Sequence, residues 1–221
     1  MNDKQLIIWD WNGTILNDID ACIASMNVML EQRNMKLLDE ATYKKIFTFP
    51  VQDYYKSIGF NFEQESFEKL SVEYIDLYKK YALKTSLQEG VVDALEQFKK
   101  DGFLQVILSA SEQKALEKQV NQHRLDQYFD ALIGLNNIFA KSKLENAIRY
   151  LEESATPPQK TILIGDTYHD YEVARSIGCD CLLVNNGHQD LLQYNIKSTK
   201  LVSSITELMK MLNFSNNNFK N

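Results

Sequence analysis

Polar side chains follow three short apolar runs of this sequence, at the point where each run ends. The residues in these positions are Asp10, Asn12, Thr14, Ser109, Ser111, Asp166, Thr167 and Asp170. Carboxylate oxygens are the ligands that Mg²⁺ prefers in proteins. Hydroxyl and backbone N–H groups orient phosphate oxygens, whose charge a cation neutralises. These residue types therefore favour chemistry on a phosphoryl group beside a bound Mg²⁺.

Asp10 is the candidate nucleophile of this set. A carboxylate can attack phosphorus and form an aspartyl phosphate that water later hydrolyses. A metal ion lets the two anions approach each other, and Gly13 allows the backbone to turn tightly close to a ligand. Either Lys141 or Lys143 could supply an ammonium group for the phosphate. Lys143 is preferred because it begins an amphipathic segment, and Lys141 stays open.

The apolar runs indicate the buried strands of a parallel sheet. They occupy residues 6–9, 106–108, 131–133, 162–164 and 182–184, and residues 201–202 are expected to add an edge strand. They do not alternate with polar residues, which is typical of strands covered on both faces. Segments with helical period lie between them, at 90–101, 143–153 and 170–177. This alternation predicts a Rossmann-like, doubly wound α/β core, in which the carboxyl ends of the strands share one edge.

Residues 18–86 interrupt the alternation of strands and helices. Residues 22–33 are apolar on one side, and aromatic and leucine residues recur at steps of three or four over 67–81. Both patterns are typical of amphipathic helices. We therefore expect a small all-helical domain at 18–86, inserted into an α/β core domain formed by 1–17 and 87–221.

Two features near the expected site admit more than one interpretation. Phe47 and Phe49 of the insert could line a substrate pocket or simply pack the insert. His188 lies on a glycine-containing loop after the run at 182–184, where it could contact a substrate or lie at the surface. The sequence leaves both pairs of alternatives open.

The charge balance argues against several classes of partner. The chain has 30 acidic and 24 basic residues and a net charge of −6, whereas nucleic-acid binding needs a basic patch. No apolar run reaches the roughly 18 residues of a membrane helix, and residues 1–5 lack the apolar stretch of a secretory signal. We therefore expect a cytoplasmic protein without a nucleic-acid or membrane partner, whose three cysteines are reduced thiols.

Three segments, taken in order, resemble motifs of the haloacid dehalogenase superfamily. Residues 7–18, IIWDWNGTILND, resemble its first motif, hhhDxDGTLxD, in which h is apolar. Val106–Ser109 resembles the second motif, and residues 162–170 resemble the fourth, hhhGDxxxD. The resemblance covers residues 5–190, places the insert where the family has its type 1 helical cap, and is greatest to phosphoglycolate phosphatase-like members. It implies a Mg²⁺-dependent phosphatase that acts on a small phosphorylated metabolite.

The resemblance implies a metal site made of four residues. Asp10 would be both nucleophile and metal ligand, and Asn12 would offer its backbone carbonyl oxygen to the metal. Asp166 would bind the metal directly, and Asp170 directly or through a water molecule.

The resemblance also implies how the phosphate would be held. Ser109 and the backbone N–H of Ala110 would bind it, beside the close backbone turn at Gly13. Lys143 would neutralise its charge, with Lys141 as the alternative.

Asn12 departs from the family pattern, which has a second Asp two residues after the nucleophile. In the family that Asp protonates the leaving oxygen and then activates water. An amide cannot shuttle a proton near pH 7, and losing a general acid–base typically costs about 10²- to 10⁴-fold. One explanation is a hydrolase in which Asp18 or His169 handles the proton, or whose leaving group needs no acid. A second is a catalytically weakened member that binds phosphorylated ligands. A third is a phosphonoacetaldehyde hydrolase-like enzyme, which would need a Schiff-base lysine from the insert.

Overall fold

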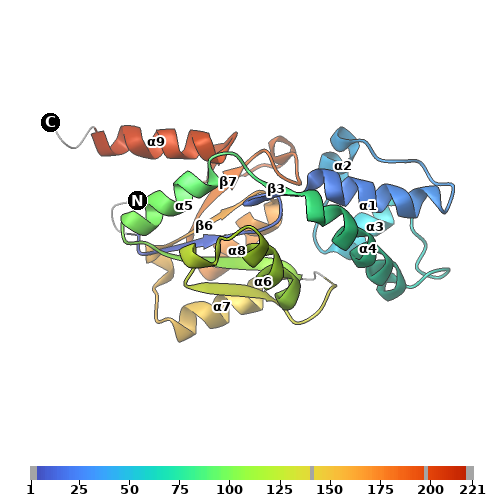
Figure 1. Ribbon diagram of the computed structural model, residues 1–221, viewed down its shortest axis with the longest axis horizontal. Helices are drawn as coiled ribbons and strands as arrows, with labels where there is room; N and C mark the ends of the chain where they lie inside the picture. Colours follow the sequence, from blue (N-terminus) through green and yellow to red (C-terminus); the bar gives the residue numbers. More distant parts are fainter. Residues whose placement is uncertain (1–3, 140–141, 197–198, 218–221) are drawn as a thin grey trace.

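The computed structural model describes residues 4–139, 142–196 and 199–217, and a six-stranded parallel sheet lies at its centre (Figure 1). Its strands are β1 (Leu6–Trp9), β4 (Leu104–Glu112), β5 (Ala131–Leu135), β6 (Thr161–Gly165), β7 (Asp180–Val184) and β8 (Lys200–Val202). Their spatial order is β5-β4-β1-β6-β7-β8. The order reverses beside β1, which pairs with β4 on one side and β6 on the other. The predicted doubly wound α/β fold is confirmed.

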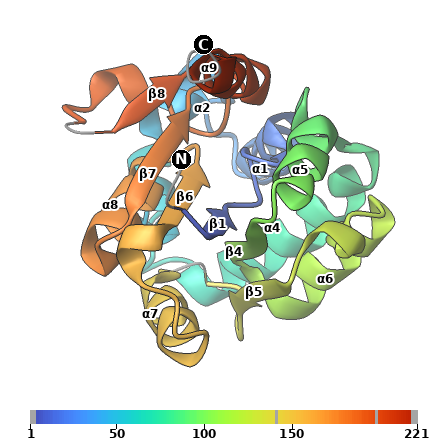
Figure 2. The ribbon, with the colours of Figure 1, turned by 90° about the vertical axis from the view of Figure 1, so that its left-hand side faces the viewer.

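Helices cover both faces of this sheet (Figure 2). One face carries α5 (Val91–Lys100), α6 (Gln113–Gln122) and α9 (Ile205–Asn217), and the other carries α7 (Leu144–Glu153) and α8 (Tyr168–Ile177). Alternate residues of β1 point to opposite faces, so that Ile7 and Trp9 pack with the first group and Ile8 with the second. Because both faces are buried, the strand has no polar side.

The strand β4 is longer than the sequence predicted. It continues past Leu108 to Glu112, with a register shift against β5 over this stretch. Ser109 and Ser111 therefore lie on the final part of the strand rather than after it. The helix that follows, α6, was not predicted. Glu112 caps it by accepting a hydrogen bond from the backbone N–H of Ala115 at 3.0 Å.

Four helices occupy most of residues 18–86. They are α1 (Ile19–Glu31), α2 (Glu40–Ile46), α3 (Val51–Ile58) and α4 (Phe67–Tyr81). They lie together at one end of the molecule (Figure 1) and share a hydrophobic cluster that includes Met26, Tyr43, Tyr55 and Leu70. The predicted helix at 67–81 coincides with α4, and the one predicted at 22–33 corresponds to α1, which begins earlier.

A short antiparallel pair of strands joins the four helices to the core. β2 (Leu16–Asn17) precedes α1, and β3 (Ser86–Leu87) follows α4. The chain therefore enters and leaves the helical insert at one place, next to the end of β1. Among the described residues, no helix combines the length and apolar character needed to cross a membrane. The three cysteines are free thiols.

Candidate active site

Three buried carboxylates meet at the carboxyl edge of the sheet. Asp10 follows β1, Asp166 follows β6, and Asp170 lies in the first turn of α8. Asp10 is 8% exposed and the other two are at most 1% exposed. One oxygen of each carboxylate lies within 4.8 Å of the others. The structure thus brings together the three acidic side chains that the sequence predicted as metal ligands.

Lys143 lies among these carboxylates. Its Nζ is 2.6 Å from Oδ1 of Asp170, forms an ion pair with Asp10, and donates a hydrogen bond to the Leu108 carbonyl at 3.0 Å. The residue directly precedes α7, so the start of that helix positions it. Burial opposes its charge, but Asp10 and Asp170 outweigh this and raise the pKa of Lys143. The alternative, Lys141, lies outside the described residues.

The three carboxylates carry more charge than Lys143 neutralises. Burial raises the pKa of Asp10 well above its ordinary value. Lys143 acts to lower this pKa, and the neighbouring carboxylates act to raise it further. Burial likewise raises the pKa of Asp166 to about 6. Burial also opposes ionisation of Asp170, but Lys143 outweighs it and lowers the pKa of Asp170. An all-oxygen donor set with excess negative charge fits a hard divalent cation such as Mg²⁺.

The backbone after β1 passes close to Asp166. Gly13 has a φ of +78°, and a Cβ atom there would lie 2.3 Å from Oδ2 of Asp166. Thr14 donates a hydrogen bond from Oγ1 to Oδ1 of Asp166 at 2.8 Å, and the N–H of His188 donates to Oδ2 at 2.6 Å. Glycine is required at position 13 because any side chain would displace the Asp166 carboxylate. A role for Gly13 in binding phosphate stays a prediction.

The end of β4 lines the same cavity as Asp10. Ser109 and Ala110 both face this cavity, and Ser109 is 1% exposed. The Ser109 Oγ accepts a hydrogen bond from the N–H of Ser111 at 3.0 Å. The pair predicted to bind phosphate therefore lies in one cavity with the predicted nucleophile.

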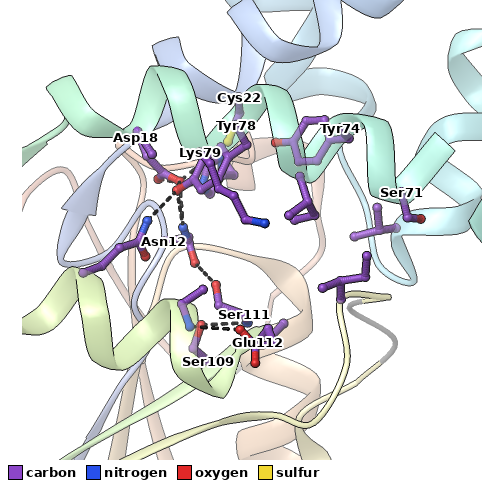
Figure 3. Close-up of a pocket in the computed structure, with 18 of the residues that line it drawn as sticks. Asn12, Asp18, Cys22, Ser71, Tyr74, Tyr78, Lys79, Ser109, Ser111 and Glu112 are labelled. Carbon is purple, nitrogen blue, oxygen red and sulfur yellow. Dashed lines mark hydrogen bonds and ion pairs between the residues drawn. The ribbon is translucent and has the colours of Figure 1, made fainter. Parts of the chain in front are cut away.

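Hydrogen bonds hold the Asn12 side chain on both sides (Figure 3). Its Nδ2 donates to Oδ2 of Asp18 at 2.7 Å and to the Tyr78 hydroxyl at 3.0 Å. Its Oδ1 accepts a hydrogen bond from the Ser111 hydroxyl at 2.7 Å. The Tyr78 hydroxyl also donates to Asp18 at 2.6 Å. Asn12 thus connects β4 in the core to α4 in the insert.

His188 is buried, not at the surface, with an exposed fraction of 4%. Its Nε2 is 3.2 Å from Oδ1 of Asp18, and its Nδ1 is 2.8 Å from the Tyr43 hydroxyl. Burial opposes charge on the ring, but Asp18 outweighs this and raises the pKa of His188 to about 9. Burial also opposes ionisation of Asp18, and His188 outweighs it so that the pKa of Asp18 is lowered. This ion pair ties the loop after β7 to the insert.

We expect the ion pair of His188 and Asp18 to make the stability of the metal-free protein fall as the solution becomes alkaline. Folding raises the pKa of His188 from 6.5 to about 9, so the contribution of its charge is fully present below pH 6.5 and is lost as the pH rises through 9. The free energy of unfolding in urea should fall by roughly 2–3 kcal/mol across this window. The variant His188→Gln should give a flatter profile, and a wild-type profile equally flat would contradict the ion pair.

The insert supplies an aromatic wall to the cavity, which has a volume of about 460 Å³. Phe47 and Phe49 line it, and Phe47 also packs in the hydrophobic cluster of the insert, so both interpretations of these residues apply. The Phe49 ring stacks on His169 with 4.8 Å between centroids. Tyr74 and Tyr78 of α4 face the cavity from the side opposite to Ser109 (Figure 3).

In sequence, the chain is similar to a family of known hydrolases. A family model described as haloacid dehalogenase-like hydrolase matches residues 7–184. The chain is 24% identical over 98 residues to the pyrophosphatase PpaX of Bacillus mycoides, which covers 44% of this chain and 46% of that protein. It is 19% identical over 193 residues to a phosphoglycolate phosphatase of Mesorhizobium japonicum, which covers 85% of each. The chain spans about half the length of the first curated relatives that it matches.

Similarity in structure extends over almost the whole chain. A haloacid dehalogenase-like family protein from Streptococcus pneumoniae superposes with a TM-score of 0.81 and a sequence identity of 19%. The superposition covers 96% of this chain and 100% of the other. At this identity the likeness is one of fold.

Proposed function

Because the chain belongs to the haloacid dehalogenase-like hydrolase family, we propose that it is a Mg²⁺-dependent phosphatase of a small phosphorylated metabolite. The observation that carries this proposal is the meeting of Asp10, Asp166 and Asp170 with Lys143 at one buried point. Phosphoryl transfer needs little from a protein besides positioning and charge stabilisation. The names of the phosphatase relatives support the same activity.

The residues around the carboxylates divide into a metal site and a phosphate site. The side chains of Asp10, Asp166 and Asp170 and the backbone carbonyl of Asn12 would hold Mg²⁺, with Asp170 binding directly or through water. Bound there, the ion would neutralise phosphate charge. Lys143 lies beside these carboxylates with an ammonium group.

The phosphate would be bound by Ser109, the N–H of Ala110 and Lys143, which face the same cavity. The Asp10 carboxylate then attacks phosphorus and forms an aspartyl phosphate while the leaving oxygen departs. Water hydrolyses this intermediate and regenerates the carboxylate. The buried position of Asp10, which is 8% exposed, keeps bulk water from competing.

The helical insert, residues 18–86, acts in this proposal as a cap over the core formed by 1–17 and 87–221. Its helices carry the aromatic wall of the cavity, and Tyr43 and Tyr78 connect it to the site through His188 and Asp18. A cap in this position would exclude water and select substrates by the shape of their leaving group.

Removing divalent cations should abolish phosphate release from a panel of phosphorylated metabolites. Mg²⁺ at 100 times its Kd should add about 2.7 kcal/mol to the free energy of unfolding, which raises Tm by roughly 5–11 °C for a chain of this size. Phosphate release and Tm should be measured with Mg²⁺ and with EDTA. In the variant Asp166→Asn, Tm should respond little to Mg²⁺. Equal phosphate release in EDTA would contradict the proposal.

A second candidate is a weakened member of the family that binds a phosphorylated ligand with little turnover. The hydrogen-bonded amide of Asn12 at the position of the family's acid–base Asp favours this alternative. Ligand-dependent stabilisation without phosphate release, in the same panel, would support it. The third explanation, phosphonate chemistry through a Schiff-base lysine, gains no support from Lys44, Lys45 or Lys56, because none of them lines the cavity. Lys44 and Lys56 form ion pairs with Glu40 and Asp53 instead.

A further inference from the structure

The Asn12 amide cannot give a proton to a leaving group, because an amide does not ionise near pH 7. Its Nδ2 faces Asp18 and Tyr78, which are hydrogen-bonded to each other (Figure 3). Its oxygen is held by the Ser111 hydroxyl. Where the family pattern has an acid, this chain therefore has a side chain fixed by the core and the insert together. Asp18 accepts hydrogen bonds from Asn12 and Tyr78 and pairs with His188, so it holds no proton for a leaving group. A leaving oxygen that receives no proton from Asn12 or Asp18 must be stable as an anion.

The cavity is larger than a two-carbon leaving group needs. Its volume of about 460 Å³ lies within the range of roughly 300–1,000 Å³ found for pockets that bury drug-sized ligands. It is continuous from Asp10 and Ser109 to the aromatic wall of the insert. A glycolate group beside Asp10 would leave most of this space unfilled.

Aromatic side chains of the insert make up much of the cavity wall. Phe49, Tyr54, Tyr74 and Tyr78 line it together with Ile75. Phe49 lies near the catalytic carboxylates, because its ring stacks on His169, the residue before Asp170. Aromatic rings pack well against one another in offset and edge-to-face arrangements. The wall therefore suits a flat, apolar, ring-bearing group.

Resting on the proposed phosphatase activity, we propose that the substrate is an aryl phosphate, a phosphate monoester of a phenol-type hydroxyl, whose ring occupies the cavity between Phe49 and α4. A phenol has a pKa of about 10, so it can depart as phenolate without an acid. An alcohol is a far weaker acid, with a pKa near that of water, and its departure depends far more on a proton donor.

The chemical steps balance without a protein acid. Asp10 forms a bond to phosphorus, the bond between phosphorus and the aryl oxygen breaks, and its electron pair leaves on the phenolate. The phenolate takes a proton from water. A second water then bonds to phosphorus, the bond to Asp10 breaks, and inorganic phosphate is released with a proton that neutralises the hydroxide from the first step. The net reaction converts an aryl phosphate and water into a phenol and inorganic phosphate.

The test compares phenyl phosphate with cyclohexyl phosphate, which have rings of similar size and differ in the acidity of the leaving hydroxyl. With Mg²⁺, the kcat/KM of the wild type for phenyl phosphate should be at least about 10² times its kcat/KM for cyclohexyl phosphate. This factor is the smaller end of what a general acid supplies. Substituted phenyl phosphates should react faster as their phenols become more acidic. The variant Asn12→Asp should raise turnover of cyclohexyl phosphate more than that of phenyl phosphate. The ratio of the two kcat/KM values should therefore become smaller.

A second variant tests the contribution of the cavity wall independently of the acid that is missing at position 12. Phe49→Leu keeps an apolar side chain of similar reach but removes the ring, so KM for phenyl phosphate should rise roughly two- to tenfold. KM for cyclohexyl phosphate should change little. Wild-type turnover of cyclohexyl phosphate within threefold of phenyl phosphate would overturn the aryl proposal and leave the phosphatase proposal standing. Absence of phosphate release from every ester of the panel would overturn both.

Discussion

The variant Asp10→Asn is expected to lose phosphate release by at least about 10⁴-fold, the scale of losing a covalent nucleophile. An amide has no anionic oxygen with which to attack phosphorus. The protein should stay folded, because burial, together with the two neighbouring carboxylates, raises the pKa of Asp10 in spite of Lys143 and so disfavours its charged form. Removing one of three neighbouring negative charges should leave Tm unchanged or higher. Phosphate release and Tm, measured on the same preparation, check this result.

The matched control for this prediction is the same substitution on the surface. Asp93→Asn changes an exposed carboxylate on α5, away from the cavity, and should leave both phosphate release and Tm at wild-type values. Ordinary turnover by the Asp10 variant would refute its assignment as nucleophile. Lost turnover together with a collapsed Tm would show instead that Asp10 has mainly a structural role.

The variant Lys143→Met should be strongly destabilised as well as inactive. Lys143 is 2% exposed and is the ammonium group that pairs with both Asp10 and Asp170. Removing one partner of a buried ionic cluster typically costs about 3–5 kcal/mol, because the remaining charges stay buried without compensation. For a chain of this size this lowers Tm by roughly 6–20 °C. Thermal unfolding in EDTA measures the effect.

Two comparisons make the Lys143 prediction specific. Lys56→Met removes a lysine that is 57% exposed and paired with Asp53, and it should change the free energy of unfolding by less than about 0.5 kcal/mol. Mg²⁺ should restore part of the stability lost in Lys143→Met, since the ion supplies positive charge at the same carboxylates. A Lys143 variant as stable as wild type would contradict the electrostatic account of the site.

The main features of the core could be predicted because they follow from local patterns. Apolar runs without alternation indicate strands buried on both faces, and β1 and β6 have that environment. Because these strands are parallel, the residues after them meet at one edge, which brings Asp10 to Asp166 although 156 positions (166 − 10) separate them. Lys143 could be preferred to Lys141 because an amphipathic segment begins there, and the structure places it directly before α7.

The hydrogen-bond network around Asp18 could not be predicted from such patterns. Asp18 was a candidate proton donor, but its partners Tyr78 and His188 lie 60 and 170 positions away (78 − 18 and 188 − 18). They meet only because the helices of the insert pack against the end of the sheet, and no periodicity of the sequence reports that packing. For the same reason, the sequence could not decide whether His188 lies at the surface or at the site.

The helix α6 was missed for a different reason, because the sequence does contain a pattern that indicates where this helix begins. Glu112 is a residue that can cap a helix, and Leu116 and Val120 follow at a spacing of four, both fully buried. The polar residues around Leu116 and Val120 obscure this pattern, so the predicted strand ends at Leu108 and no helix is predicted after it. The consequence is functional, since Ser109 and Ser111 are held by an extended strand and its helix cap rather than by a loop.

The central claim is that phosphate is transferred to the Asp10 carboxylate. The most direct test mixes the Mg²⁺-loaded protein with phenyl phosphate carrying radiolabelled phosphorus, quenches the mixture in acid, and maps the label to peptides. The account predicts a label on the peptide that contains Asp10, removable by alkali as expected of an acyl phosphate and absent from Asp10→Asn. Turnover of the same substrate with no labelled peptide, or with the label on another residue, would contradict it.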